Sequence, residues 1–204
     1  MSNLSLSNPT LNRSLLERVS VAVAPRADAR VATVVKVVVG VALLTLLAQV
    51  RILIGPVPIT GQTLGVLLLG AAYGLPLGLV SVGAYLVLGA VGLPVFAGSA
   101  SGLAYLAGPT GGYLLGFVMA AVLLGLLARR GWDKSVLSCC LMMLLASAVI
   151  YVPGVAWLKQ ALGLSWGAAV ATGVTPFLIG DAVKLAIATA ALPGAWRLLG
   201  TGSS

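Results

Sequence analysis

Residues 31–50 read VATVVKVVVGVALLTLLAQV, and Lys36 is the single charged residue in this stretch. A helix of about 20 residues is about 30 Å long, which matches the hydrocarbon core of a bilayer. The stretch therefore predicts a membrane-spanning helix. Further apolar stretches, separated by short polar or Gly- and Pro-containing segments, follow along the chain.

The composition agrees with a membrane protein. The chain has 204 residues, of which 60% are hydrophobic and 8% charged, whereas soluble domains are about 25% charged. A soluble protein of this size leaves roughly a third of its surface exposed and could not hide so much apolar surface. We therefore predict a compact all-α integral membrane protein in a lipid bilayer. The net charge is +8. In a membrane protein, Lys and Arg residues usually mark the cytoplasmic side, so nucleic-acid binding is not expected.

The composition also excludes several kinds of chemistry. The chain has no His, which excludes His-ligated zinc and a Ser-His-Asp triad. The adjacent Cys139 and Cys140 lie in an apolar stretch and are interpreted as lipid- or core-facing thiols. There is no Walker A loop, so the chain is not expected to hydrolyse ATP itself. An enzyme is not expected, and no cofactor or metal is predicted.

We predict six membrane-spanning helices. The second apolar stretch is interrupted by Gly74 and Pro76, which indicates a short helix and a longer one joined by a tight turn. Residues 93–109 are expected to form a loop or re-entrant segment, and residues 157–173 an amphipathic interfacial helix. The predicted spans are 31–50, 62–73, 76–91, 112–128, 135–155, and a last one that opens with Thr175 as N-cap and Pro176 at N1 and ends at Leu192.

The basic residues place both termini in the cytoplasm by the positive-inside rule. Arg51 and Lys159 lie on the predicted outer side, and Lys36 and Lys184 lie within spans. We expect a cytoplasmic tail over residues 1–30, a six-helix domain over 31–196 and a cytoplasmic tail over 197–204. The remaining basic residues lie on the predicted inner side: Arg13, Arg18, Arg26, Arg30, Arg129, Arg130, Lys134 and Arg197.

Asp181 and Lys184 are two charged residues within the last predicted span. They are three residues apart and therefore share one face of the helix. A charge at this depth costs about 2.5–3.5 kcal/mol on insertion scales. Two interpretations stay open: a structural ion pair that links two helix turns, or the polar floor of an outward-facing ligand site.

Polar residues near the predicted outer face are the other candidates. The segments 93–102 and 106–117 are rich in Gly, Ser and Ala; small residues of this kind often serve close helix packing in membranes. Thr110 and Tyr113 place hydroxyl groups at the mouth of a span, and Gln62 and Thr63 open the second span near the same face.

These residues form a pattern that resembles a known family, the substrate-binding S components of biotin transporters (BioY) of the energy-coupling-factor (ECF) class. The resemblance covers about residues 31–196 and rests on four motifs in register. They are Gly55-x-Val57-Pro58-Ile59-Thr60-x-Gln62-Thr63, Gly92-Leu93-Pro94-Val95-Phe96-Ala97-Gly98, Gly108-Pro109-Thr110-Gly111-Gly112-Tyr113 and Gly180-Asp181-x-x-Lys184.

The resemblance implies an S-component fold in the bacterial plasma membrane, with biotin bound near the outer face. It also implies a T component and two ABC-type ATPase subunits as partners. The chain departs from the family pattern at Ser99-Ala100-Ser101 and at Ala29-x-x-x-Thr33, where an Ala-x-x-x-Ala docking pattern is expected. Asp181 and Lys184 match the polar pair of the family and are the first choice for holding biotin. The other predicted biotin-binding residues are Tyr113, Thr110, Gln62, Ser99 and Tyr105. A stand-alone secondary transporter of a small vitamin-like solute is the alternative.

Two motions are expected. The loop Gly55-Pro56-Val57-Pro58 is stiff at its prolines and is predicted to be a lid that orders over biotin. The inner half of the protein offers almost no polar lining for a pore, so the whole body is expected to reorient against a partner. The small residues Ala29, Ala32, Thr33 and Gly40 are the predicted docking face.

Overall fold

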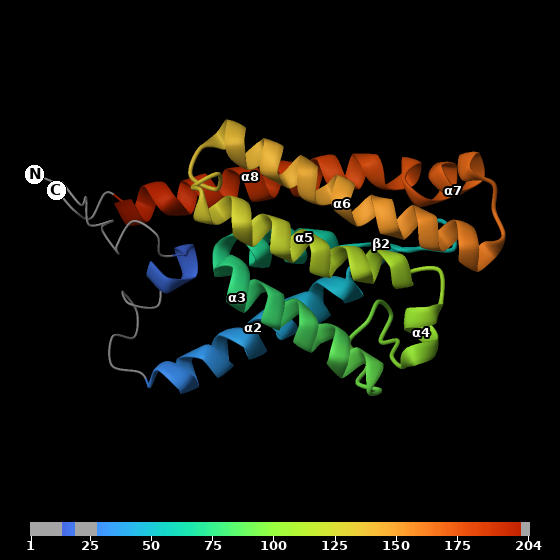
Figure 1. Ribbon diagram of the computed structural model, residues 1–204, viewed down its shortest axis with the longest axis horizontal. Coiled ribbons are helices and arrows are strands. Elements are labelled where there is room, and N and C mark those ends of the chain that lie inside the picture. The colour runs from blue at the N-terminus through green and yellow to red at the C-terminus, as the bar shows by residue number, and fades with distance from the viewer. Residues whose placement is uncertain (1–13, 19–27, 201–204) are drawn as a thin grey trace, which may run out of the picture.

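The computed structural model describes residues 14–18 and 28–200. It is a bundle of long helices with a two-stranded antiparallel hairpin at one end (Figure 1). The elements are α2 (Ala29–Gln49), β1 (Arg51–Ile52), β2 (Ile59–Thr60), α3 (Gln62–Ala90), α4 (Leu103–Ala107), α5 (Gly111–Arg129), α6 (Val136–Leu162), α7 (Trp166–Gly173), the 3₁₀ helix η2 (Thr175–Phe177) and α8 (Leu178–Gly200).

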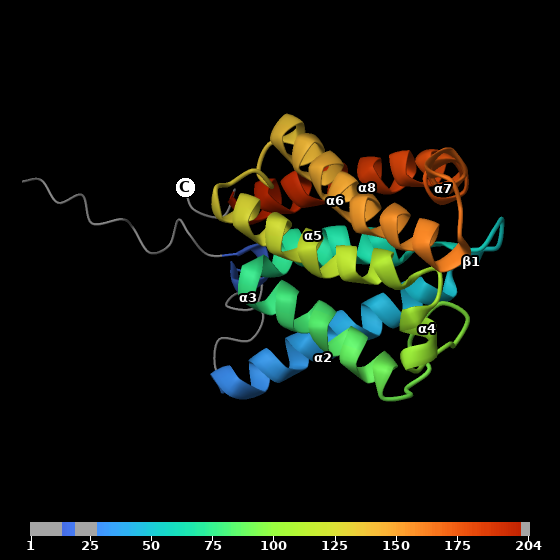
Figure 2. The same cartoon turned by 45° about the vertical axis from the view of Figure 1, so that its right-hand side comes forward.

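The two ends of the bundle differ in character. The strands β1 and β2 and the short helices α4 and α7 lie together at one end, which we call the hairpin end (Figures 1 and 2). The opposite end carries the turn between α5 and α6 and the last residues of α8, and we call it the basic end. Arg129, Arg130, Lys134 and Arg197 belong to the basic end. This segregation agrees with the predicted inner and outer sides.

Helix α3 is a hairpin of two helices. Gly74 has φ 72° and ψ 177°, a conformation outside the helical region that glycine adopts without strain. Gln62 Nε2 donates to Tyr85 Oη at 2.6 Å, and a Cβ on Gly78 would lie 3.3 Å from Gly70 Cα. The two halves therefore run antiparallel, and the predicted turn is confirmed. Among the described residues five helices are long and apolar enough to span a membrane when α3 is counted once; six crossings and cytoplasmic termini stay predictions.

Helix α6 is longer than predicted. The end expected near Val155 is wrong, because α6 continues through Pro153 to Leu162 and ends at Gly163 with φ 64°. Glycines on α5 let the two backbones touch at this point: a Cβ on Gly112 would lie 2.3 Å from the Pro153 carbonyl oxygen. In membranes, neighbouring helices hold a helix together across a proline in this way. The interfacial helix expected over 157–173 is consequently reduced to α7.

Helix α8 also departs from prediction at both ends. Thr175 is not its N-cap; it lies inside the 3₁₀ helix η2, whose own cap residue is Val174. The end expected at Leu192 is wrong too, because α8 runs through Pro193 to Gly200. Pro193 is fully buried, and Trp196, one turn further on, donates its Nε1 hydrogen to the Asp133 carboxylate in the α5–α6 turn. Packing holds the helix together beyond its proline.

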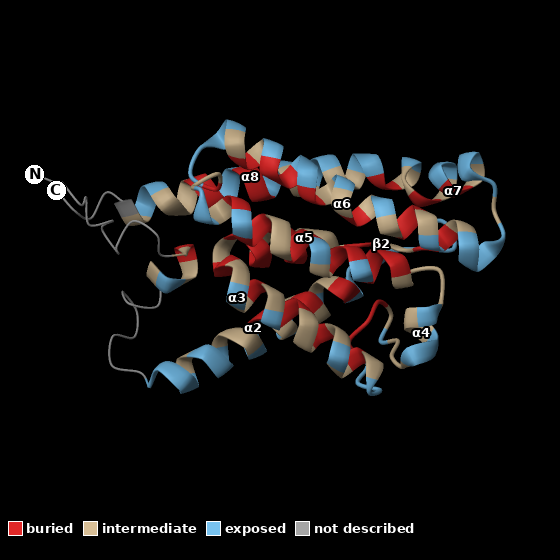
Figure 3. Ribbon diagram, viewed as in Figure 1, coloured by how far each residue is buried: buried red, intermediate tan, exposed pale blue. Residues whose placement is uncertain are grey.

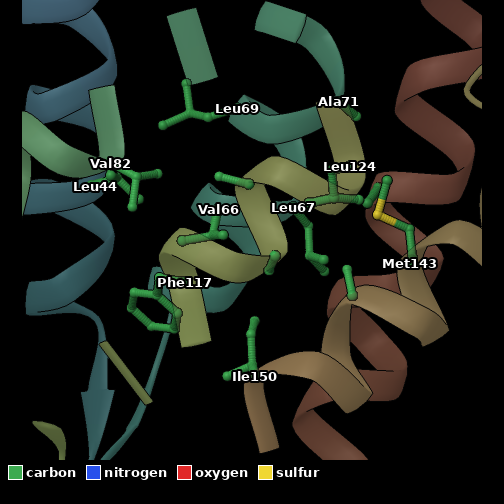
Figure 4. Packing of buried hydrophobic residues seen from close by; sticks show 14 of the residues in the cluster. Leu44, Val66, Leu67, Leu69, Ala71, Val82, Phe117, Leu124, Met143 and Ile150 are labelled. Atoms are coloured by element: carbon green, nitrogen blue, oxygen red, sulfur yellow. The ribbon is translucent and has the colours of Figure 1, made fainter. Parts of the chain in front are cut away.

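The core lies between α3, α5 and α6. Figure 4 shows Val66, Leu67, Phe117 and Leu124 packed together there, and all four are at most 3% exposed. The outward faces of α2, α6 and α8 are exposed (Figure 3) and apolar: Val38 is 60% exposed and Leu137 and Ile179 are each 83% exposed. Such a surface suits lipid and would be unusual in water.

The predicted N-terminal tail falls mostly outside the described residues, as do positions 201–204. Residues 15–18 differ from the expected tail, because they form a helical turn. Its Leu15 is 7% exposed and belongs to the core cluster. Ser14 and Glu17 cap the turn reciprocally, Ser14 N–H on the Glu17 carboxylate at 3.2 Å and Glu17 N–H on Ser14 Oγ at 3.3 Å.

The predicted docking face on α2 needs one correction. Gly40 is buried, and a Cβ there would lie 2.9 Å from Ser81 Oγ. Gly40 therefore packs against α3 and cannot belong to a surface that meets a partner. Ala29 and Thr33 are exposed and Ala32 is half-buried.

Candidate functional site

A cavity with an empty volume of about 560 Å³, its mouth included, lies at the hairpin end. Its walls come from the hairpin loop, α3, α4, α5, α6, η2 and α8. Six of the seven residues expected at the site line it: Gln62, Tyr105, Thr110, Tyr113, Asp181 and Lys184.

The polar floor joins three helices. Lys184 Nζ on α8 lies 2.9 Å from Asp181 Oδ1 and donates to Thr63 Oγ1 on α3 at 2.8 Å. Tyr151 on α6 donates its hydroxyl hydrogen to Asp181 Oδ2. The Asp181 and Lys184 side chains are 16% and 12% exposed, respectively. The two interpretations of the charged pair are therefore compatible, since it links helices and also faces the cavity.

Each of these groups keeps hydrogen-bonding capacity for a ligand. An ammonium has three donors, of which Lys184 uses two among the described residues. A carboxylate offers about four acceptor positions, and Asp181 accepts from Lys184 and Tyr151. The floor can thus present a donor and an acceptor side by side.

Gln62 lies in the cavity wall, and its side-chain amide forms hydrogen bonds with other residues of the protein. It is 5% exposed; its Nε2 donates to Tyr85, and its Oε1 accepts from Thr60 Oγ1 at 2.9 Å. The Tyr85 hydroxyl in turn donates to the Val95 carbonyl at 3.1 Å. Gln62 therefore ties β2 and α3 to the 92–102 loop and positions the wall.

An aromatic wall faces the interior. Tyr113 is stacked with Phe177 at a centroid distance of 6.3 Å, and the Tyr151 ring stands edge-on to both at 6.4 Å. The Tyr113 hydroxyl donates to the Gly173 carbonyl at 2.8 Å. Glycine is required at Gly154, because a Cβ there would lie 2.5 Å from the Tyr113 ring. The result is a rigid apolar surface for a ring system.

Tyr105 and Thr110 lie near the mouth. The Tyr105 ring on α4 is stacked on Phe96 at 5.0 Å. Burial raises the pKa of the Tyr105 hydroxyl, and the nearby Thr110 hydroxyl and Arg51 charge act in the opposite direction. Tyr105 is therefore a neutral phenol near pH 7 and can donate or accept a hydrogen bond.

The hairpin loop forms the roof. Val57 and Pro58 line the cavity, and Val57 is 6% exposed. The strands that carry the loop pair Arg51 with Thr60 and Ile52 with Ile59. This position is what a lid requires; its movement stays a prediction.

The structure does not bring Ser99 into the cavity. Ser99 is exposed with φ 58°, and its N–H donates to Gln49 Oε1 at 3.1 Å. Tyr151 and Phe177 line the site but were not singled out from the sequence. Tyr151 could have been found as the single tyrosine of a largely apolar span; Phe177 carries no such signal.

The described residues contain no group of three His, Cys, Asp or Glu side chains that could hold a metal ion. Cys139 is buried and Cys140 half-buried, and neither forms a disulfide. The chemistry on offer is hydrogen bonding and apolar contact.

Comparisons with known proteins agree on one family. The family model described as the BioY family matches residues 19–201. A probable biotin transporter BioY from Pyrococcus horikoshii is 43% identical over 72% of this chain and 86% of its own length. The biotin transporter BioY of Thermotoga maritima is 37% identical over 76% and 89%. The crystal structure of the S component for biotin from an ECF-type ABC transporter matches with a TM-score of 0.76 at 26% identity, over 82% of this chain and 92% of that one.

Proposed function

Because the chain belongs to the BioY family, we propose that it is the biotin-binding S component of an ECF transporter in the plasma membrane. The observation that carries the proposal is the charged pair of Asp181 and Lys184 at the floor of a cavity with an aromatic wall. The resemblance of the fold to a solved S component for biotin supports it.

The floor suits the ureido group of biotin. That group has N–H donors beside a carbonyl acceptor, and Asp181 and Lys184 offer the opposite pattern: an acceptor beside a donor. We assign the ureido N–H groups to Asp181 and the ureido oxygen to Lys184. The fused rings then lie against Tyr113, Tyr151 and Phe177, whose faces bury apolar surface.

The energy for transport comes from other chains in this proposal. The sequence has no Walker A loop, so a T component and two ATPase subunits supply the hydrolysis. The alternative, a stand-alone secondary transporter, predicts uptake without them.

Equilibrium binding to the detergent-solubilised protein tests the ligand. Biotin is expected to bind, and thiamine and riboflavin, which lack a cyclic urea with a carboxylate tail, are expected not to compete. Saturable binding of thiamine or riboflavin with no binding of biotin would overturn the assignment.

Uptake by proteoliposomes tests the partners. Sustained accumulation of biotin is expected only when a T component, both ATPase subunits and ATP are present. Accumulation by the chain alone would favour the secondary transporter.

A further inference from the structure

The floor of the cavity is electrically balanced. Asp181 and Lys184 lie 2.9 Å apart and cancel each other's charge, and Lys184 also donates to Thr63. A ligand that carries a carboxylate therefore brings one negative charge that the floor does not neutralise. A buried or half-buried charge needs a partner.

Arg51 is a cation beside the mouth of the cavity. A second hollow opens at the hairpin end beside the cavity and shares Pro58, Tyr105 and Thr110 with it. Arg51 lines this hollow, and its charge acts on the Tyr105 hydroxyl. The Arg51 side chain therefore lies where the tail of a ligand would leave the cavity if its rings were bound on the floor.

The Arg51 side chain is exposed, and its guanidinium lies against the backbone of Gly98. At Gly98, φ is +73° and a Cβ would come within 2.1 Å of Arg51 Nη1. A side chain at this position would displace the guanidinium. Gln49, the last residue of α2, joins the 92–102 loop that carries Gly98: its side-chain amide donates to the Phe96 carbonyl at 3.2 Å.

Arg51 has no acidic partner in the part of the chain that the structure describes. The ion pair found there is that of Asp181 with Lys184. The chain's other acids are Glu17, Asp28 and Asp133, and they lie in or beside elements of the basic end. No hydrogen bond joins the guanidinium to another described residue, and Arg51 is exposed and lines the hollow, so its N–H donors are available to a carboxylate.

We propose that Arg51 binds the carboxylate of the ligand and so fixes its orientation, with the ureido rings on the floor and the carboxylate at the mouth. The inference rests on the proposed function, because it takes biotin as the ligand. It makes Arg51 a specificity residue: acids are selected over their neutral esters. An Arg–carboxylate pair of this kind forms two parallel hydrogen bonds.

The test compares biotin with biotin methyl ester, which has the same rings and no charge on its tail. The parent protein is expected to bind the ester about tenfold more weakly than biotin. Arg51→Gln should weaken biotin about tenfold and leave the affinity for the ester unchanged, and Arg51→Lys should fall between the two. Gly98→Ala should act like Arg51→Gln.

The matched control is Lys159→Gln, which removes the cation that lies over the Trp166 ring at the same end. This variant should bind biotin and biotin methyl ester with the parental affinities.

The ester also reports on folding, since a variant that keeps its ester affinity has kept its site. If Arg51→Gln leaves biotin binding within twofold of the parent, or weakens biotin and ester equally, the carboxylate does not bind at Arg51. Absence of biotin binding by the parent protein would instead contradict the proposed function, so the two failures are distinguishable.

Discussion

At the scale of single residues, the function depends on a few polar atoms in an apolar protein. Asp181 is held from two sides, by Lys184 and by Tyr151, and these contacts come from two helices. A carboxylate fixed in this way needs no reorganisation when a ligand with N–H donors arrives. The pair therefore acts as a preorganised acceptor and donor.

The first prediction is that Asp181→Asn and Lys184→Ala each weaken biotin binding by about 30- to 4,000-fold. The reason is that loss of one partner from a buried charged contact costs about 2–5 kcal/mol. Isothermal titration of the purified variants measures it. Asp28→Asn, at the N-cap of α2, is the control and should bind as the parent does. An affinity within twofold of the parent for either site variant would contradict the site.

At the scale of elements, close backbone contacts decide how the helices meet. Glycines on α5 touch the backbone of α6 at Pro153 and Ile150. These contacts bring the backbones of α5 and α6 close together, and Tyr151 lies on α6 between the two contact positions. The position of a site residue thus depends on glycines on another helix.

The second prediction is that Gly116→Ala lowers the stability of the protein by about 1–3 kcal/mol, because a Cβ there would lie 2.8 Å from Ile150 Cα. Thermal unfolding in detergent measures it. Gly83→Ala is the matched control: apart from the neighbouring backbone of its own helix, no atom lies within 4 Å of a Cβ placed there, and alanine is the better helix former. The control should be neutral or stabilised. Equal melting temperatures for the two variants would count against the packing argument.

The third prediction concerns the hairpin loop. A spin label at Leu53, which is 67% exposed, should lose mobility when saturating biotin is added, because Val57 and Pro58 in the same loop line the cavity. The background carries alanine at Cys139 and Cys140. A second label at Leu137, on the far end of the bundle, should not respond. Unchanged spectra at Leu53 would mean that the loop is a fixed roof.

At the scale of the whole molecule, we expect the bundle to move as one body. The described residues form one core, and α2 lies on the opposite side of the bundle from α6 and α8 (Figures 1 and 2). The outer surface of α2 is therefore free of the binding site. This arrangement suits a body that binds biotin at one end and meets a partner along a flank.

The fourth prediction is that Ala32→Trp abolishes ATP-driven uptake while biotin affinity stays within twofold of the parent. Ala32 is half-buried near the start of α2, and close approach to a partner helix requires small side chains. Leu137→Trp, on the exposed face of α6, is the control and should transport normally. Gly40 is unsuitable for this test because it packs against Ser81. Normal uptake by Ala32→Trp would place docking elsewhere.

The sequence by itself determined the membrane class, the long apolar helices, the turn at Gly74 and the family, because each is recorded in local composition or in short motifs. It also indicated six of the cavity-lining residues. The sequence could also have predicted the helical turn at residues 15–18, because Ser14 and Glu17 have the spacing of a capping box.

Only the tertiary structure decided where α6 and α8 end, which way Gly40 and Ser99 face, and that Tyr151 reaches Asp181. These features depend on contacts between segments far apart in the chain, such as Gly112 against Pro153 and Ser99 against Gln49. A proline stops a helix only when nothing else holds the next turn, and here a neighbouring helix does. Local sequence patterns therefore indicate which helices form, and packing between distant segments decides where each helix ends and which residues it buries.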